Sequence, residues 1–343
     1  MSQPEGIDAE RVEGWFAGHV PGARPPLRFE RITGGRSNLT YRVTDEAGGA
    51  WALRRPPLSG GLGSAHDMSR EYRIISALTN TDVPVPRATG FCGDESVNGS
   101  DFYVMDFVEG TVVRDADAAQ VAFPQGERRR IGEYVVDALV AIHAVDPDEA
   151  GLGELGRRDG YVARQLRRWK GQWDASKTRE LPAMDETHSR LSGRVPGQQG
   201  MSIVHGDFRL DNTILTADGE IAAVVDWELS TLGDPLADLG LLLVYWAEPG
   251  DQVVPLANAP TLAPGFPSRS DMAARYALKT GRDLSELDFY VALGYWKLAA
   301  ILEGVYARYS SGSYGETADD FRQFEVVVEQ LADAAAESAA RLG

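Results

Sequence analysis

Hydrophobic and polar positions follow two different periods along this chain. In the first third, short apolar runs with a period of two predict strands, and two stretches with a helical period predict helices. The strands are expected at Leu27–Thr33, Leu39–Thr44, Ala50–Arg54, Ala88–Cys92 and Phe102–Phe107, and the helices at Ile7–His19 and Ala65–Leu78.

Beyond residue 107 the helical period dominates. Helices are predicted at Gln125–Val145, Arg158–Trp173, Asp185–Leu191, Leu236–Trp246, Asp271–Lys279, Glu286–Tyr309 and Ala318–Leu342. A β-hairpin interrupts them, with strands predicted at Thr213–Leu215 and Glu220–Val225. The pattern predicts an α+β fold with two lobes: an N-lobe over residues 1–107, built on a small antiparallel β-sheet, and a larger, mainly helical C-lobe over residues 108–343.

The composition is typical of a globular protein, with 43% hydrophobic and 25% charged residues. Cys92 is the only cysteine, which excludes an internal disulfide and a cysteine-based metal cage and suits a reducing compartment. The first residues carry no signal segment, and the longest apolar run, Leu239–Ala247, is shorter than the roughly 20 residues of a membrane span. We therefore expect a cytoplasmic protein without a membrane partner.

The net charge is −17, from 34 Lys and Arg side chains against 51 Asp and Glu side chains. Because nucleic-acid binding depends on basic patches, this balance argues against a nucleic-acid partner. The acidic surplus either attracts cationic partners over a long range or serves general solubility, and the sequence leaves both interpretations open.

Phosphoryl-transfer chemistry is indicated by the segment His205-Gly-Asp-Phe-Arg-Leu-Asp-Asn212 and by Asp226, which ends an apolar run. This chemistry needs one carboxylate to orient the attacking hydroxyl, and an amide oxygen with a second carboxylate to hold Mg²⁺ on the nucleotide phosphates. Asp207 is the expected catalytic base, and Asn212 and Asp226 are the expected ligands of Mg²⁺, with ATP as the phosphate donor. Glu228 is a further candidate for a metal or substrate contact.

Two segments of the N-lobe are expected to contact the nucleotide. Gly34 and Gly35 leave room for backbone N–H groups to approach phosphate oxygens, and Ser37 adds a hydroxyl, although a Gly-Gly pair is also a common turn. The strand that ends near residue 107 is expected to run into a hinge between the lobes, where backbone groups from Asp106 to Val108 bond the edge of adenine.

The third predicted strand supplies a cation for the phosphates. Ala52 and Arg54 share one face of this strand, which matches the small residue beside adenine and the cation beside phosphate in the Val-Ala-Ile-Lys strand of protein kinases. Arginine replaces lysine here, and Arg55 is an alternative to Arg54. Glu71 lies on the apolar stripe of the following helix and is expected to pair with Arg54, with Asp67 as its rival.

The order of these motifs resembles the aminoglycoside phosphotransferase-type small-molecule kinases over roughly residues 25–330. Within that family, Val225–Asp238 and Phe289–Arg308 are most similar to the kinase-like domains associated with acyl-CoA dehydrogenases. The resemblance implies a two-lobed protein-kinase-like fold, the use of ATP and Mg²⁺, and a small-molecule hydroxyl acceptor. It favours a hydroxyacyl-CoA or related metabolite over an antibiotic.

Only residues 227–233 separate Asp226 from Asp234, which leaves no room for a peptide-docking activation segment and favours a small-molecule acceptor. Three functions stay open. The first is a kinase for an anionic metabolite, in which Lys297 and Arg308 lie beside a wall of aromatic side chains. The alternative is that these aromatic residues simply pack in the core. They are Tyr290, Tyr295, Trp296 and Tyr306. The second is an aminoglycoside kinase that uses acidic side chains, namely Glu248, Asp251 and Glu303. The third is a nucleotide-binding regulator without turnover.

Overall fold

The computed structural model describes residues 4–32, 38–58, 67–255, 258–310 and 322–342. Contacts between Cα atoms divide the chain into two units. The smaller unit comprises Met1–Thr111, Ile214–Thr216 and Ala222–Leu229, and the larger unit comprises Val112–Thr213, Ala217–Ile221 and Ser230–Gly343. The lobe limits at residues 107 and 108 stay a prediction.

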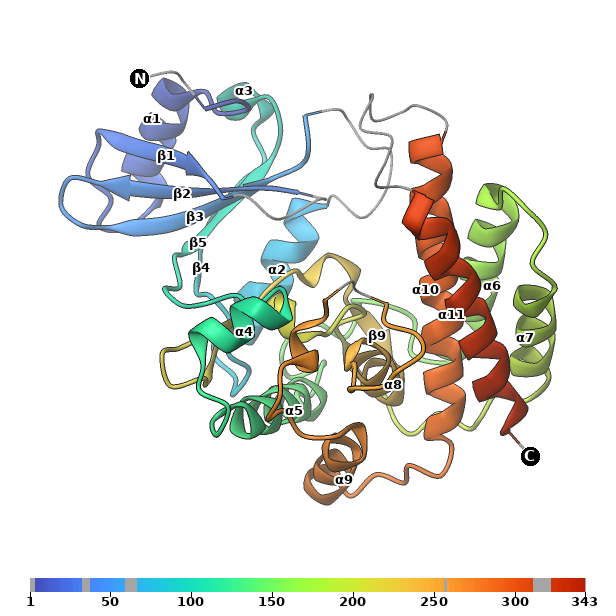
Figure 1. Ribbon diagram of the computed structural model, residues 1–343. Coiled ribbons are helices and arrows are strands. Elements are labelled where there is room, and N and C mark those ends of the chain that lie inside the picture. The colour runs from blue at the N-terminus through green and yellow to red at the C-terminus, as the bar shows by residue number, and fades with distance from the viewer. Residues whose placement is uncertain (1–3, 33–37, 59–66, 256–257, 311–321, 343) are drawn as a thin grey trace. The chain divides into compact units, whose positions relative to one another are not determined.

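A five-stranded antiparallel sheet forms the centre of the smaller unit, with the strand order β1-β2-β3-β5-β4 (Figure 1). Its strands are β1 (Leu27–Arg31), β2 (Leu39–Asp45), β3 (Ala50–Arg55), β4 (Ala88–Cys92) and β5 (Phe102–Asp106). Its helices are α1 (Ala9–His19), α2 (Met68–Leu78) and α3 (Glu95–Asn98). All five predicted strands and both predicted helices are present in the structure, with ends that differ by a few residues, whereas the four-residue α3 was not predicted.

The two faces of β3 have different environments because successive side chains point to opposite sides of a sheet. Trp51 and Leu53 belong to a hydrophobic cluster that also contains Trp15 and Phe16 of α1. Burial of each such side chain contributes roughly 1.5–3 kcal/mol to stability. Arg54 lies on the opposite face. The apolar face therefore anchors the sheet on α1 and leaves the other face of β3 for charged groups.

The larger unit is mainly helical and contains eight helices among the described residues. They are α4 (Ala116–Ala122), α5 (Arg128–Ala144), α6 (Tyr161–Ser176), α7 (Pro182–Gly193), α8 (Leu236–Tyr245), α9 (Arg269–Thr280), α10 (Leu287–Ser310) and α11 (Arg322–Ala340). The short strands β6 (Ser202–Val204) and β9 (Thr231–Gly233) of this unit pair with each other. β7 (Thr213–Leu215) pairs with β8 (Ile221–Val224), and most residues of these two strands belong to the smaller unit. The sequence predicted all of these except α4, β6 and β9. None of the helices described is long and apolar enough to cross a membrane.

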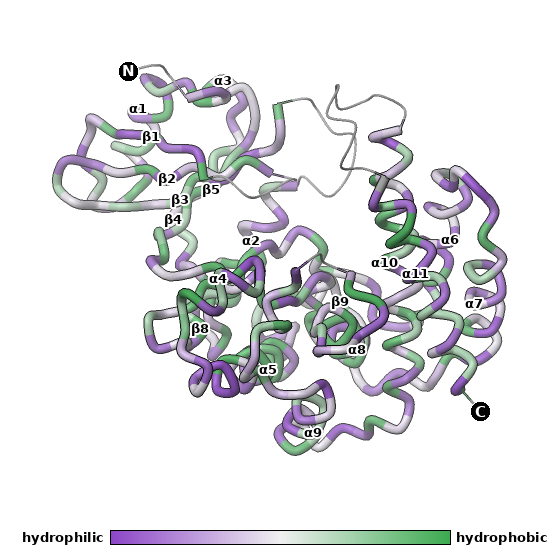
Figure 2. The backbone as a smooth tube through the Cα atoms, viewed as in Figure 1, coloured by the Kyte–Doolittle hydropathy of each residue, from purple (hydrophilic) through white to green (hydrophobic). Residues whose placement is uncertain are grey.

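The helix α8 is buried along most of its length and packs against α10. Most of its residues are hydrophobic (Figure 2). The two helices approach closely because Gly240 has no side chain at the point of contact. A Cβ atom at Gly240 would lie 2.6 Å from the backbone carbonyl carbon of Tyr290, which is far inside van der Waals contact. The glycine therefore sets the spacing between α8, which carries Asp238, and α10.

We expect Gly240→Ala to lower the free energy of unfolding by about 1–3 kcal/mol, because the clash with a backbone outweighs the helix propensity of alanine. Gly171→Ala in α6 is the matched control. A Cβ atom at Gly171 meets nothing within 4 Å, so this change should raise the free energy of unfolding by up to about 1 kcal/mol. Urea denaturation measures both values. Equal stabilisation by the two changes would contradict the close contact of α8 and α10.

Candidate active site

The loop between β6 and β7 carries Asp207, and a buried carboxylate of α8 fixes its backbone. The N–H groups of His205 and Gly206 donate to the two oxygens of Asp238, at 2.6 and 2.9 Å. His143 Nε2 lies 3.4 Å from the same carboxylate. Burial by itself raises the pKa of Asp238, but hydrogen bonds from His143 and from Gly206 outweigh it and bring the pKa below its usual range. Asp238 is therefore an ionised anchor for the residues just before Asp207.

The carboxylate of Asp207 has its own donors. The hydroxyl of Tyr245, the last residue of α8, donates to Oδ1 at 3.0 Å, and the amide nitrogen of Asn212 lies 3.2 Å from Oδ2. Arg209 Nε lies 3.4 Å from the same oxygen. Burial and the charge of Asp207 raise the pKa of Tyr245 well above its usual value, so the phenol keeps its proton and acts as a donor. The carboxylate is 21% exposed, which leaves it accessible to a further hydroxyl.

The amide of Asn212 has a defined orientation. Its nitrogen donates to the backbone carbonyl of Asp207 at 2.8 Å as well as to the carboxylate, and both partners are acceptors. The side-chain oxygen of Asn212 must therefore point the other way, and it accepts no hydrogen bond from any described residue. A free amide oxygen beside a carboxylate is a ligand type that Mg²⁺ accepts.

In the smaller unit, Arg54 lies among three carboxylates, and we call Arg54, Glu71, Asp226 and Glu228 the Arg54 cluster. The Nε atom of Arg54 lies 3.1 Å from the carboxylate of Glu71. The Nη2 atom of Arg54 pairs with Asp226 and lies 3.8 Å from the carboxylate of Glu228. Burial lowers the pKa of Arg54, but Glu71, Tyr103 and the other two carboxylates of the cluster outweigh it and raise the pKa above its usual value. With three acids to one base, the cluster carries excess negative charge, which suits a bound cation.

The ion pair between Arg54 and Glu71 that the sequence predicted is present in the structure. Arg55 and Asp67, the alternatives to Arg54 and Glu71 for this ion pair, have other partners. Arg55 donates to the backbone carbonyls of Gly6 and Asn98, and Asp67 caps the N-terminus of α2 by accepting from the backbone of Arg70. Among the two arginines, only Arg54 therefore contacts the carboxylates of the cluster.

Asp226 has an uncommon backbone conformation. Its φ is 69°, in the left-handed region that non-glycine residues rarely adopt. Such strain persists only where the surroundings fix it, and it is concentrated at functional sites. The ion pair with Arg54 and the 29% exposure of its side chain leave part of this carboxylate open to a ligand.

The residues predicted to bind the nucleotide are only partly described. Gly34, Gly35 and Ser37 lie outside the described residues. The backbone N–H of Asp106 is already bonded to the carbonyl of Arg87 at 2.9 Å. That of Val108 makes no hydrogen bond to any described residue. Ala52 is buried on the strand that carries Arg54. The roles predicted for all these residues stay predictions.

The sequence analysis missed Tyr245 as a partner of Asp207. A signal was present, because Tyr245 and Asp238 lie two helical turns apart on the same face of an otherwise apolar helix. It also missed that Lys297 of α10 donates to the carbonyl of Gly206 at 2.7 Å. Of the aromatic residues considered for an acceptor wall, Tyr290 and Trp296 are 1% and 0% exposed, so packing in the core is the correct interpretation for these two.

Comparison with known proteins supports a phosphotransferase. The chain is 35% identical over 324 residues to acyl-CoA dehydrogenase family member 11 of Gallus gallus, which covers 92% of this chain. The matched part of this chain spans only 41% of the length of that relative. A Ralstonia eutropha protein provisionally named an aminoglycoside phosphotransferase has a solved structure with a TM-score of 0.82 and 32% identity, and the match covers 98% of this chain and 99% of that one.

A more distant structure, aminoglycoside phosphotransferase APH(4)-Ia with ADP and hygromycin B, shares the fold at a TM-score of 0.62 and 15% identity, over 98% of this chain and 99% of the other. These likenesses confirm the α+β, two-lobed protein-kinase-like fold that the sequence predicted. The model of the phosphotransferase enzyme family matches residues 28–290, more than half of the chain. The chain therefore belongs to the phosphotransferase enzyme family.

Proposed function

We propose that this protein transfers the γ-phosphate of ATP to a hydroxyl group of a small molecule. The observation that carries the proposal is the geometry of Asp207, whose carboxylate is held between Tyr245 and Asn212 and is still accessible. A carboxylate held in this way orients a hydroxyl and accepts its proton as the phosphoryl group is transferred. The transfer is direct, from ATP to the acceptor oxygen, with ADP as the leaving group and no covalent phosphoenzyme.

The other residues bind and orient the nucleotide. Arg54 contacts the phosphates, and the loop with Gly34, Gly35 and Ser37 supports them. Ala52 leaves space beside the adenine ring, and the free backbone N–H of Val108 bonds its edge. APH(4)-Ia, which shares this fold, was solved with ADP, and this supports ATP as the donor.

The donor chemistry also fits Mg²⁺. Asn212 in the larger unit presents a free amide oxygen, and Asp226 in the smaller unit presents a partly exposed carboxylate. Among the described residues, no group of three or more His, Cys, Asp and Glu side chains is arranged to hold a metal without other ligands. Mg²⁺ commonly takes one or two protein oxygens and completes its shell with phosphates and water. When bound, the ion neutralises the charge that develops on the phosphates.

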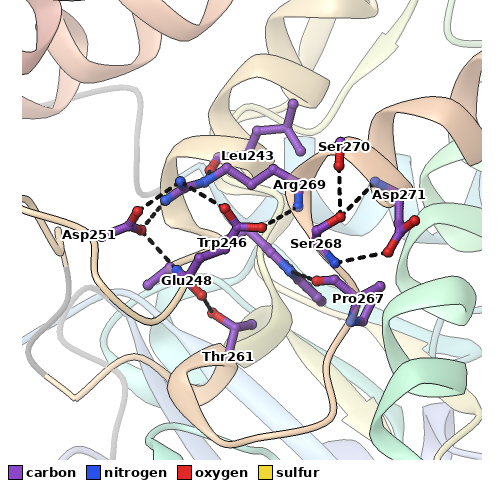
Figure 3. A network of polar contacts seen from close by, with 11 residues as sticks. Leu243, Trp246, Glu248, Asp251, Thr261, Pro267, Ser268, Arg269, Ser270 and Asp271 are labelled. Atoms are coloured by element: carbon purple, nitrogen blue, oxygen red, sulfur yellow. Dashed lines mark hydrogen bonds and ion pairs between the residues drawn. The ribbon is translucent and has the colours of Figure 1, made fainter.

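The acidic residues that a cationic aminoglycoside needs are already paired. Figure 3 shows Glu248 and Asp251 around Arg269. The backbone N–H of Arg269 donates to Glu248 at 2.8 Å, and its guanidinium pairs with Glu248 at 3.4 Å and with Asp251 at 3.0 Å. Glu303 is fully buried and accepts from Thr178, at 2.6 and 2.7 Å, and from Arg179 at 3.1 Å. All three carboxylates therefore already have cationic or hydrogen-bonding partners, which weakens the case for an antibiotic amine as their ligand.

The pairing of these acids removes the support for a cationic acceptor, and we propose instead a hydroxyacyl-CoA or a related hydroxy metabolite. The likeness to an acyl-CoA dehydrogenase family member supports this class. An intact set of Asp207, Asn212 and Asp226 favours a catalyst over a regulator without turnover, because each of the three chemical roles has its side chain.

The roles of the two aspartates are separable by substitution. Asp207→Asn should lower the turnover number by about a hundredfold or more, because the hydroxyl loses its proton acceptor, while Mg–ATP affinity stays within about twofold. Asp226→Asn should weaken Mg–ATP binding itself, because a carboxylate is the stronger magnesium ligand. Titration of each variant with Mg–ATP by calorimetry, together with turnover measurements, tests both assignments. Unchanged turnover by the Asp207 variant would refute its role as base.

The hydroxyl of Tyr245 should position Asp207 without contacting the nucleotide. Tyr245→Phe keeps the packing of the ring and removes one hydrogen bond to a charged group, which contributes about 1.5–3 kcal/mol. We expect the turnover number to fall about tenfold or more, with little change in the dissociation constant of Mg–ATP. If nucleotide binding fell as much as turnover, the effect would be general damage to the loop rather than loss of orientation.

The acceptor class is tested with Mg–ATP and a panel of hydroxyacyl-CoAs, free hydroxy acids and aminoglycosides. Mass spectrometry detects the added phosphate, and Asp207→Asn serves as the control. We expect a phosphorylated product from an anionic acceptor and none from the aminoglycosides. Phosphorylation of an aminoglycoside alone would overturn the proposed acceptor, and nucleotide binding without product from any class would favour the regulator.

A further inference from the structure

Two cations of the larger unit lie against one aromatic ring beside the Asp207 loop. Arg168 Cζ is 5.0 Å, and Lys297 Nζ is 5.5 Å, from the centre of the Trp169 ring. Trp169 and Arg168 belong to α6, and Lys297 belongs to α10. Such cation–π contacts are favourable, but each contributes only about 0.5–2 kcal/mol. The ring holds the two positive charges in place without neutralising them.

Neither cation has a carboxylate within ion-pair distance in the part of the chain that the structure describes. Lys297 donates one hydrogen bond, to the carbonyl of Gly206, and therefore keeps two N–H groups for other acceptors. The guanidinium of Arg168 makes no hydrogen bond to any described residue. Exposed arginines without an ion pair, such as Arg167, are common among the described residues, but the other three lysines of the chain, Lys170, Lys177 and Lys279, each have a carboxylate partner.

Their charges disfavour each other. Burial lowers the pKa of Lys297 below its usual value, and the charge of Arg168 lowers it further, whereas the more distant carboxylates of Asp207 and Asp238 oppose the shift. A buried ammonium group with a second cation nearby costs free energy, and an anion bound beside it would lower this cost. Lys297 also lines a small cavity of about 20 Å³ with Gln165, Gly206 and Asp238. The cavity has room for about one water molecule, so the acceptor's anion would bind outside it.

The position of the pair indicates what this anion is. Lys297 bonds the residue that directly precedes Asp207, so the free donors of the pair lie near the proposed catalytic base. We infer that Arg168 and Lys297 form an anion subsite that binds a carboxylate or phosphate group of the acceptor, close to its reacting hydroxyl. This subsite rests on the proposed function. Among the proposed acceptors it favours a hydroxy metabolite that carries its anionic group within a few bonds of the hydroxyl over a hydroxyacyl-CoA, whose phosphates lie many bonds away. Guanidinium and ammonium groups together suit either anion.

Calorimetric titration tests the subsite with small probes of both kinds. Glycerol 3-phosphate represents a phosphate and 3-hydroxybutyrate a carboxylate, with glycerol and 1,3-butanediol as their uncharged counterparts. The protein is first saturated with Mg–AMP-PNP, so that nucleotide phosphate sites are filled, and each titration is repeated without nucleotide. We expect at least one anionic probe to bind about tenfold or more tightly than its uncharged counterpart. Which of the two probes does so identifies the anion.

Three substitutions assign the effect. Arg168→Gln and Lys297→Met should each weaken binding of the anionic probe by about tenfold and leave the uncharged probe unchanged. Arg167→Gln is the matched control, because Arg167 is the exposed neighbour of Arg168 on α6, and it should change affinity by less than about twofold. Arg168 is also exposed, so the first variant keeps the test valid if loss of Lys297 impairs folding.

The outcomes separate this inference from the proposed function. Equal affinity for charged and uncharged probes, or equal losses in the Arg167 and Arg168 variants, would overturn the subsite even if Mg–ATP binds and an acceptor is phosphorylated. Preference for an anion that depends on Arg168 would support the subsite. If this preference persisted while Mg–AMP-PNP failed to bind, the proposed kinase activity would be refuted and the anion subsite would stand.

Discussion

The buried carboxylate of Asp238 is the constraint on which the proposed active site depends. A carboxylate in the interior is costly unless hydrogen bonds satisfy it, and here the donors are two successive backbone N–H groups of the loop that carries Asp207. The anchor and the loop therefore stabilise each other. Asp234 has a similar role one turn earlier, since it caps α8 and accepts from Tyr290 of α10 at 2.8 Å. Both anchors lie in α8 or at its start, so the spacing of α8 and α10, set by Gly240, determines where the loop lies.

In both units, most buried acidic side chains have a basic partner. Buried acids such as Glu71 and Glu303 have arginine partners, and a helix-end arginine, Arg269, neutralises the acids around it. Two groups near the proposed reacting residues are not balanced in this way. The Arg54 cluster has more acids than bases, which suits a magnesium ion, and the cations on Trp169 have no acid within ion-pair distance among the described residues, which suits an anionic acceptor. The proposals rest on these two groups because a partly buried charge near a reactive group favours the binding of an oppositely charged ligand.

Much of this was predictable from the sequence because the signals are local. Strands and helices of ordinary length follow from hydrophobic periodicity, and the pairing of Arg54 with Glu71 follows from which face each side chain occupies. Short elements such as α4, β6 and β9 were missed because three to seven residues are too few to establish a period. The aromatic residues of α10 carry no signal that separates a binding wall from a core, and only the structure shows that Trp296 is fully buried.

The sequence by itself determined the fold class, the family and the residue types needed for phosphoryl transfer, because these depend on periodicity and on the order of motifs along one chain. The tertiary structure decided which charged side chains have a partner of opposite charge and which do not. Whether Glu248 is free to bind a cation depends on Arg269, and whether Lys297 is free to bind an anion depends on the distance from every carboxylate around it. Partners of this kind come from distant parts of the chain. Electrostatic energy depends on distance and burial in three dimensions, which sequence spacing does not specify.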